Sequence, residues 1–185
     1  MKNLFYCILL LVSANLNSQT TNDSFSEADF KKTKQLIDHF GSVLKKYYPE
    51  TSTEKVYQKY LSDLLLRKVN PQIIKEETSI DLFASFRQSS TFEKIWSNKL
   101  KGKKTIYRIN YKGSYFDYLI KNIPNKKVRE SFEFFKKEES LDLSPYILVA
   151  SLQTELTEKD YNTQSVQMAI AMMFYYDIIL QYSTN

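Results

Sequence analysis

Cysteine is almost absent from this chain. Cys7 is the only one among 185 residues, and it lies in an N-terminal segment that we expect to be removed. The remaining chain then has no disulfide and no thiolate, which excludes cysteine-based catalysis and cysteine-ligated zinc sites. Such a domain is held together by its core alone. A chain of about 165 residues can provide that, because it buries roughly 70% of its unfolded surface.

Glycine and proline are also scarce, with three and four copies. Few glycines argue against sheet-rich folds with many tight turns and against glycine-rich loops that hold phosphates. Hydrophobic residues make up 43% of the chain and charged residues 25%, which is typical of a globular protein. We therefore predict an all-α fold: a single compact domain of six to eight helices over residues 19–185, around an apolar C-terminal helix. One short extended or irregular segment is expected near 101–113.

Histidine occurs once, as His39. A histidine-based site would need Ser42 or Asp38 beside it, but Asp38 points about 100° away on a helix and cannot orient the ring. We predict no catalytic residue, no metal site and no cofactor. A carboxylate-based hydrolase remains an alternative, because two acids about 5–10 Å apart suffice for glycoside cleavage. Its candidate pairs are Glu76 with Glu77, Glu138 with Glu139, and Glu155 with Glu158.

The N-terminus has the order of an export signal. Lys2 precedes the apolar run Leu4–Val12, and the polar, small-residue stretch Ser13–Ser18 follows. This order is typical of a cleavable secretory signal, here over residues 1–18, and the apolar run is too short to span a bilayer. Cleavage is expected after Ala14 or Ser18. The sequence thus predicts a secreted or periplasmic protein, with no integral membrane segment after signal cleavage.

Helical periodicity dominates the rest of the chain. Ser26 and Asp29 have the spacing of a capping box, and a second helix is expected to follow Ser52 or Thr53. The pattern predicts a helix over 91–100. Residues 105–111 instead alternate, but no convincing partner strand is evident. The segment 163–182 is apolar nearly all round and is expected to be the central helix.

Positive charge is concentrated between Lys94 and Arg129. Eleven basic residues lie there against the single acid Asp117, although the whole chain carries only +5. Aromatic residues alternate with these cations, a combination that suits an anionic polymer or lipid surface. A solvated face with the aromatic side chains turned into the core is the alternative. The predicted contact residues are Lys99, Lys101, Lys103, Lys104, Arg108, Lys112, Lys126, Lys127 and Arg129.

Asp177 is the second candidate. Helical rotation places it on the same apolar face as Val166, Ile170 and Met173. A buried carboxylate has to be paired, hydrogen-bonded or protonated, and perturbed acids concentrate at functional sites as well as in structural pairs. Asp177 is therefore a candidate buried functional acid, with a structural role as the alternative.

These features favour an exported, non-catalytic helical binding protein that contacts an anionic lipid, a glycan or an acidic protein through residues 94–129. The alternative from another functional class is a protein-binding adaptor or inhibitor that uses an apolar or aromatic patch. The partner itself cannot be identified from the sequence.

Overall fold

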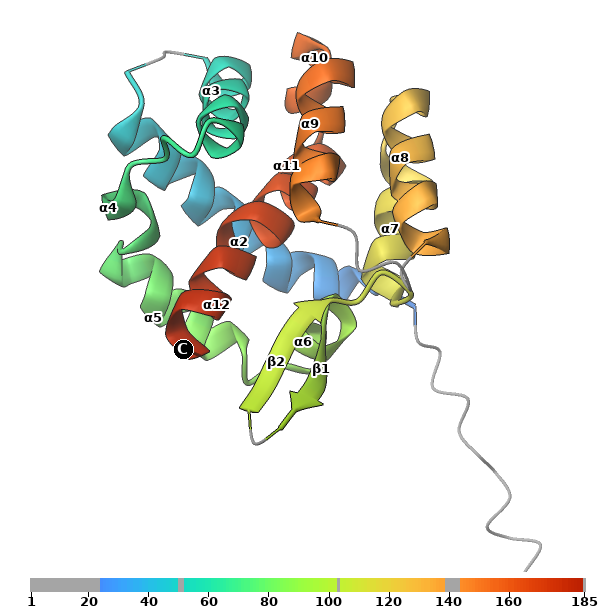
Figure 1. Ribbon diagram of the computed structural model, residues 1–185. Coiled ribbons are helices and arrows are strands. Elements are labelled where there is room, and N and C mark those ends of the chain that lie inside the picture. Colours follow the sequence, from blue (N-terminus) through green and yellow to red (C-terminus); the bar gives the residue numbers. More distant parts are fainter. Residues whose placement is uncertain (1–23, 50–51, 103, 139–143, 185) are drawn as a thin grey trace, which may run out of the picture.

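The computed structural model describes residues 24–49, 52–102, 104–138 and 144–184 (Figure 1). The described chain is mostly helical with one small sheet, so the predicted all-α class is confirmed. The predicted signal segment 1–18 lies outside the described residues. Within them, no helix has both the length and the apolar character needed to cross a membrane.

The first helices begin where the sequence predicts. Helix α2 starts behind Ser26, whose backbone and side chain exchange hydrogen bonds with Asp29 in the expected capping box. The elements in chain order are α2 (Glu27–Tyr47), α3 (Thr53–Leu65), α4 (Pro71–Ile74), α5 (Glu77–Phe86), α6 (Ser90–Ile95), β1 (Trp96–Lys101), β2 (Lys104–Ile109), α7 (Ser114–Asn122), α8 (Lys126–Lys137), α9 (Pro145–Glu155), α10 (Glu158–Tyr161), α11 (Gln164–Ala171), η3 (Met172–Tyr176) and α12 (Asp177–Thr184).

The last three elements form one long helix that the others surround, as predicted for the apolar C-terminal segment (Figure 1). Its middle, η3, is a π-helical turn whose residues are all buried. Such a turn alters the backbone hydrogen-bonding pattern of the helix. Here the carbonyl oxygen of Phe174 accepts a hydrogen bond of 2.7 Å from the Tyr60 hydroxyl. The ring of Tyr175 stacks on Phe40 from α2, with centroids 4.5 Å apart.

The predicted helix over 91–100 is wrong in its second half. Helix α6 ends at Ile95, and β1 pairs with β2 in an antiparallel hairpin. Trp96 and Leu100 fit a helical stripe, but the same residues also alternate in a strand. The pairing satisfies the backbone groups along the edge that the two strands share, which neither segment could do alone. Gly102 has φ of 64° at the turn, a value that glycine tolerates best.

Candidate functional site

Some of the basic residues predicted to form a contact surface lie on one face of the hairpin. Lys99 lies opposite Ile106 in the ladder and Ser97 lies opposite Arg108, so Lys99 and Arg108 share a face because strand side chains alternate. Lys104 is two residues before Ile106 and lies on that face too. All three cations are exposed. We call Lys99, Lys104 and Arg108 the cationic hairpin face.

Three other predicted residues lie near this face along the chain. Lys101 is the backbone partner of Lys104 at the end of the ladder, and Lys103 lies outside the described residues. Lys112 is exposed in the turn that precedes α7. None of these three adds a described side chain to the cationic hairpin face.

The remaining three predicted cations lie at the start of α8, and their contacts are with other elements. Lys127 forms an ion pair of 3.0 Å with Glu155 at the end of α9. Lys126 lies 3.7 Å from Glu130 on its own helix. Nη1 of Arg129 donates to the carbonyl oxygen of Ile123 at 3.1 Å. Figure 1 shows α8 beginning at the end of the molecule away from the hairpin. The nine residues are thus divided between two regions.

Lys94, at the start of the basic segment, points inward instead of to solvent. Its ammonium group donates to the buried carboxylate of Asp29 at 2.7 Å. Thr91 Oγ1 also donates to Asp29, at 2.7 Å, and the backbone of Ser26 donates at 2.8 Å. Burial raises the pKa of Asp29, but the hydrogen bonds from Lys94, Ser26 and Thr91 outweigh it and hold the pKa well below its usual range.

Half of the aromatic residues in the basic segment belong to the core, and the other half are partly buried against it. Trp96, Tyr115 and Phe116 are buried, whereas Tyr107 is partly buried on the hairpin. Aromatic stacking by the first three on an external ligand is therefore excluded. The larger exposed apolar side chains belong to several separate elements, and they are Leu66, Leu100, Phe134, Tyr146, Ile147 and Tyr182.

Asp177 attaches the hairpin to the central helix. Nε1 of Trp96 in β1 donates to its carboxylate at 2.9 Å, and the Gln181 side chain also hydrogen-bonds to it. Gln181 in turn donates to the carbonyl oxygen of Tyr107 in β2 at 2.9 Å. Burial raises the pKa of Asp177 to about 6, against the opposing effect of the two hydrogen bonds. The acid predicted to be buried is partly buried in the structure, and it joins α12 to β1 directly and to β2 through Gln181.

A cavity of about 320 Å³ lies beside this contact, between β2 and α12. Asp177, Gln181 and Arg108 supply its polar groups, and Ile109 and Met173 are among its apolar walls. Arg108 therefore links the cationic hairpin face to the rim of this cavity. The carboxylate of Asp177 is already committed to Trp96 and Gln181, which favours its structural role.

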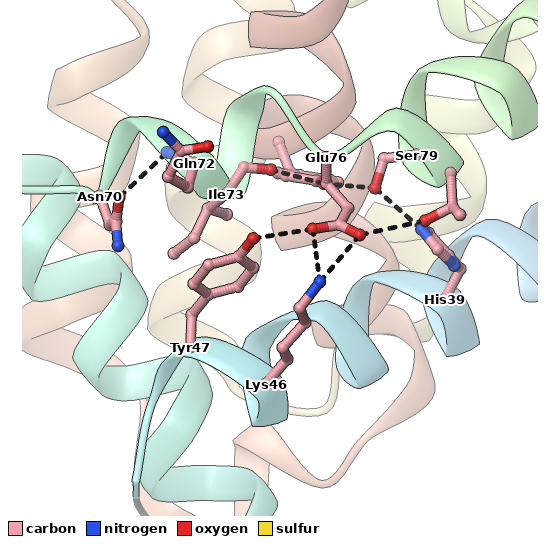
Figure 2. A network of polar contacts seen from close by, with 10 residues as sticks. His39, Lys46, Tyr47, Asn70, Gln72, Ile73, Glu76 and Ser79 are labelled. Atoms are coloured by element: carbon pink, nitrogen blue, oxygen red, sulfur yellow. Dashed lines mark hydrogen bonds and ion pairs between the residues drawn. The ribbon is translucent and has the colours of Figure 1, made fainter.

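A second polar network joins α2 to the segment around α4 and α5 (Figure 2). Nε2 of His39 lies 2.8 Å from Oγ of Ser79, and the Tyr175 hydroxyl donates to the same oxygen at 2.6 Å. Burial lowers the pKa of His39, against the opposing charge of Glu76. A serine beside a histidine is the pair that nucleophilic catalysis uses. Ser79 has no exposed surface, so a substrate cannot reach its oxygen, and the network is structural.

The neighbouring acid, Glu76, is held at the edge of this network. It accepts a hydrogen bond of 2.8 Å from the Tyr47 hydroxyl and pairs with Lys46 at 3.1 Å (Figure 2). The hydrogen bonds from Tyr47 and Lys46 lower the pKa of Glu76. Three acids considered for hydrolysis, Glu76, Glu138 and Glu155, are engaged in ion pairs, and Glu139 lies outside the described residues. Among the residues that the structure describes, no three His, Cys, Asp or Glu side chains gather as a metal site.

Two features of these sites could not be found from sequence patterns. His39 and Ser79 are forty residues apart, and only packing of α5 on α2 brings them together. Arg87 lies outside the basic segment, yet its guanidinium carbon is 5.5 Å from the ring centroid of Tyr107 on the hairpin. The cation that directly follows α5 thus lies against the face opposite the cationic hairpin face.

Comparisons of the chain with protein-family models, with curated proteins and with solved structures found no match.

Proposed function

We propose that this protein is an exported, non-catalytic binding protein that contacts an anionic surface through the cationic hairpin face. One observation carries the proposal: Lys99, Lys104 and Arg108 are exposed on the same side of a two-stranded hairpin. Lys99 and Lys104 have no acidic partner in the part of the chain that the structure describes. Their charges are available to an external anion.

Three other lysines of the basic segment differ from Lys99 and Lys104 in this respect. Lys94, Lys126 and Lys127 each pair with an acid of the protein itself. The hairpin projects from the helical body at the lower edge of Figure 1, so a large, flat partner could approach it. Cations that neutralise a polyanion release its counterions, which makes such binding weaker as salt increases.

If the cationic hairpin face is the contact surface, binding to an anionic surface should weaken with salt and should require Lys99 and Lys104. In the part of the chain that the structure describes, the buried core residues lie between Leu36 and Leu180 and Phe25 packs against them, so a chain that begins at Gln19 keeps these residues. We expect this chain to co-sediment with an anionic polysaccharide resin or with phosphatidylglycerol vesicles. Its affinity should fall about tenfold or more between about 50 and about 500 mM salt. The double variant Lys99→Glu/Lys104→Glu should lose this binding.

The control is Lys126→Glu/Lys127→Glu, which changes the net charge by the same amount at the start of α8. It should bind like the unmodified chain, because α8 begins away from the hairpin. It should also stay folded, since surface ion pairs such as Lys127 with Glu155 contribute little to stability. Equal losses in both double variants would show that only net charge matters. Absence of binding by the folded, unmodified chain would also refute the proposal. Circular dichroism establishes that each variant is folded.

Export is the second part of the proposal, supported by the charge, apolar run and small residues of positions 2–18. Expression of the full chain in a bacterial host should release a product that begins at Asn15 or Gln19, as read by N-terminal mass spectrometry of the periplasmic and culture fractions. A cytoplasmic product that keeps Lys2 and the apolar run would contradict this part. The binding experiment does not depend on that outcome.

A further inference from the structure

A cavity of about 380 Å³ lies on the opposite side of the hairpin from Lys99 and Arg108. Asn98 and Tyr107 form its hairpin wall, and they are direct partners in the ladder. Arg87 and Gln88, from the end of α5, and Glu93 of α6 line the rest. Pockets for small molecules have volumes of about 300–1,000 Å³, so this one suits a ligand of about the size of a sugar ring with its substituents.

Two aromatic rings hold the guanidinium group of Arg87 in a position that suits the binding of an anion. Its guanidinium carbon lies 5.5 Å from the ring centroid of Tyr107 and 5.9 Å from that of Phe92. The two rings restrict the side chain and remove water from part of it, while the N–H groups at its edge stay available. A guanidinium binds a carboxylate through two parallel hydrogen bonds, which a lysine cannot do.

Three polar side chains that line the cavity can form hydrogen bonds with a ligand. Within the described residues, the side-chain amides of Gln88 and Asn98 have no hydrogen-bond partner, and Glu93 has no ion pair. Each amide both donates and accepts, and a carboxylate accepts only. A ligand that satisfies all three needs donors as well as acceptors. Sugar hydroxyls provide both, whereas a phosphodiester group only accepts hydrogen bonds and has no donor for Glu93.

We propose that this cavity binds one uronic acid unit of an anionic polysaccharide, with Arg87 on the sugar carboxylate and Gln88, Asn98 and Glu93 on its hydroxyls. The inference rests on the proposed function and names the chemical class of its partner. The cationic hairpin face then attracts the polymer as a whole, while the cavity recognises a single unit of it.

The test uses a hexamer of galacturonic acid and the tryptophan fluorescence of the chain from Gln19. Trp96 is the only tryptophan and lines the cavity, so its emission reports occupancy. We expect saturable binding of the acidic hexamer and none of neutral maltohexaose. Arg87→Gln and Arg87→Lys should each weaken binding about tenfold or more, because both remove the two-bond contact. Asn98→Ala, an exposed position, should weaken it about threefold.

The matched control is Arg67→Gln. Arg67 also lies over an aromatic ring, 5.8 Å from the centroid of Tyr146, but away from the hairpin. This variant should bind the hexamer like the unmodified chain. If Arg87→Gln binds the hexamer normally, or if maltohexaose binds equally well, the saccharide site is refuted. Arg87-dependent binding of phosphatidylglycerol vesicles without binding of the hexamer would refute it in favour of a lipid.

The two proposals fail in different ways. If Lys99→Glu/Lys104→Glu loses polymer binding but Arg87→Gln does not, the cationic hairpin face stands and the saccharide site is refuted. If neither double lysine variant has an effect and Arg87→Gln alone loses the hexamer, the saccharide site stands and the contact through the cationic hairpin face is refuted.

Discussion

Replacement of Asp29 by alanine should lower the free energy of unfolding by about 3 kcal/mol or more. The Asp29 side chain is only 6% exposed, and it accepts hydrogen bonds from Ser26, Thr91 and Lys94. The variant leaves the Lys94 ammonium, which is 22% exposed, without its anion. It also removes the acid of the capping box at the start of α2, which accepts a hydrogen bond from the backbone N–H of Ser26.

Urea unfolding followed by circular dichroism measures this loss. The control is Asp38→Ala on the same helix, which removes an exposed ion pair with Lys34 and should cost about 0.5 kcal/mol or less. The pKa of Asp29 is lower in the folded protein than in the unfolded chain. Its stabilisation is therefore present above the unfolded value of about 4 and is lost as the pH falls below it. Asp29→Ala should lack this acid-sensitive part. A loss under about 1 kcal/mol would contradict the buried pair.

Replacement of Asp177 by asparagine should stabilise the protein at neutral and alkaline pH. The pKa of this carboxyl is about 6 in the fold against 3.8 without it. The folded state therefore binds the proton more tightly, and this stabilisation is complete below the unfolded pKa and lost as the pH rises through 6. The difference corresponds to about 3 kcal/mol. Asparagine is always neutral and its Oδ1 can still accept the hydrogen bond from Trp96.

The measurement is the free energy of unfolding in urea, read from Trp96 fluorescence in steps from about pH 4 to about pH 8. The unmodified chain should lose stability from this group across that range, whereas Asp177→Asn should show a flatter profile and the larger stability at the alkaline end. Asp81→Asn, an exposed position on α5, serves as the control and should leave the profile unchanged. If Asp177→Asn is less stable than the unmodified chain at about pH 8, the assigned cost of the buried charge is wrong.

Local patterns predicted the parts of this fold that local interactions decide. The capping box at Ser26, the start of α3 behind Ser52 and the buried C-terminal helix each follow from residues a few positions apart. The hairpin did not follow, because Trp96 and Leu100 satisfy both periods and the choice depends on pairing with 104–109. Tertiary pairing decided between two patterns that the sequence allows equally.

The candidate sites show the same division. Helical rotation predicted Asp177 to be buried, and it is partly buried behind the π-helical turn, but its partner Trp96 lies eighty-one residues away. The concentration of cations was visible in the sequence. The ion pairs of Lys94 with Asp29 and of Lys127 with Glu155 were not, and neither was the hairpin register that places the cations of the cationic hairpin face side by side. Arg87 reaches the hairpin only through the packing of α5, so no spacing rule could include it.

The π-helical turn η3 sets the direction in which the side chains of α12 point around the helix axis. Each residue of an α-helix advances the side-chain direction by about 100°, so a turn that holds one residue more shifts the whole of α12 around its own axis. Asp177 and Gln181, which hold β1 and β2, are the first and fifth residues of that helix. The orientation of the hairpin and of its cations therefore depends on the extra residue in the buried π-helical turn, which sets the rotation of α12.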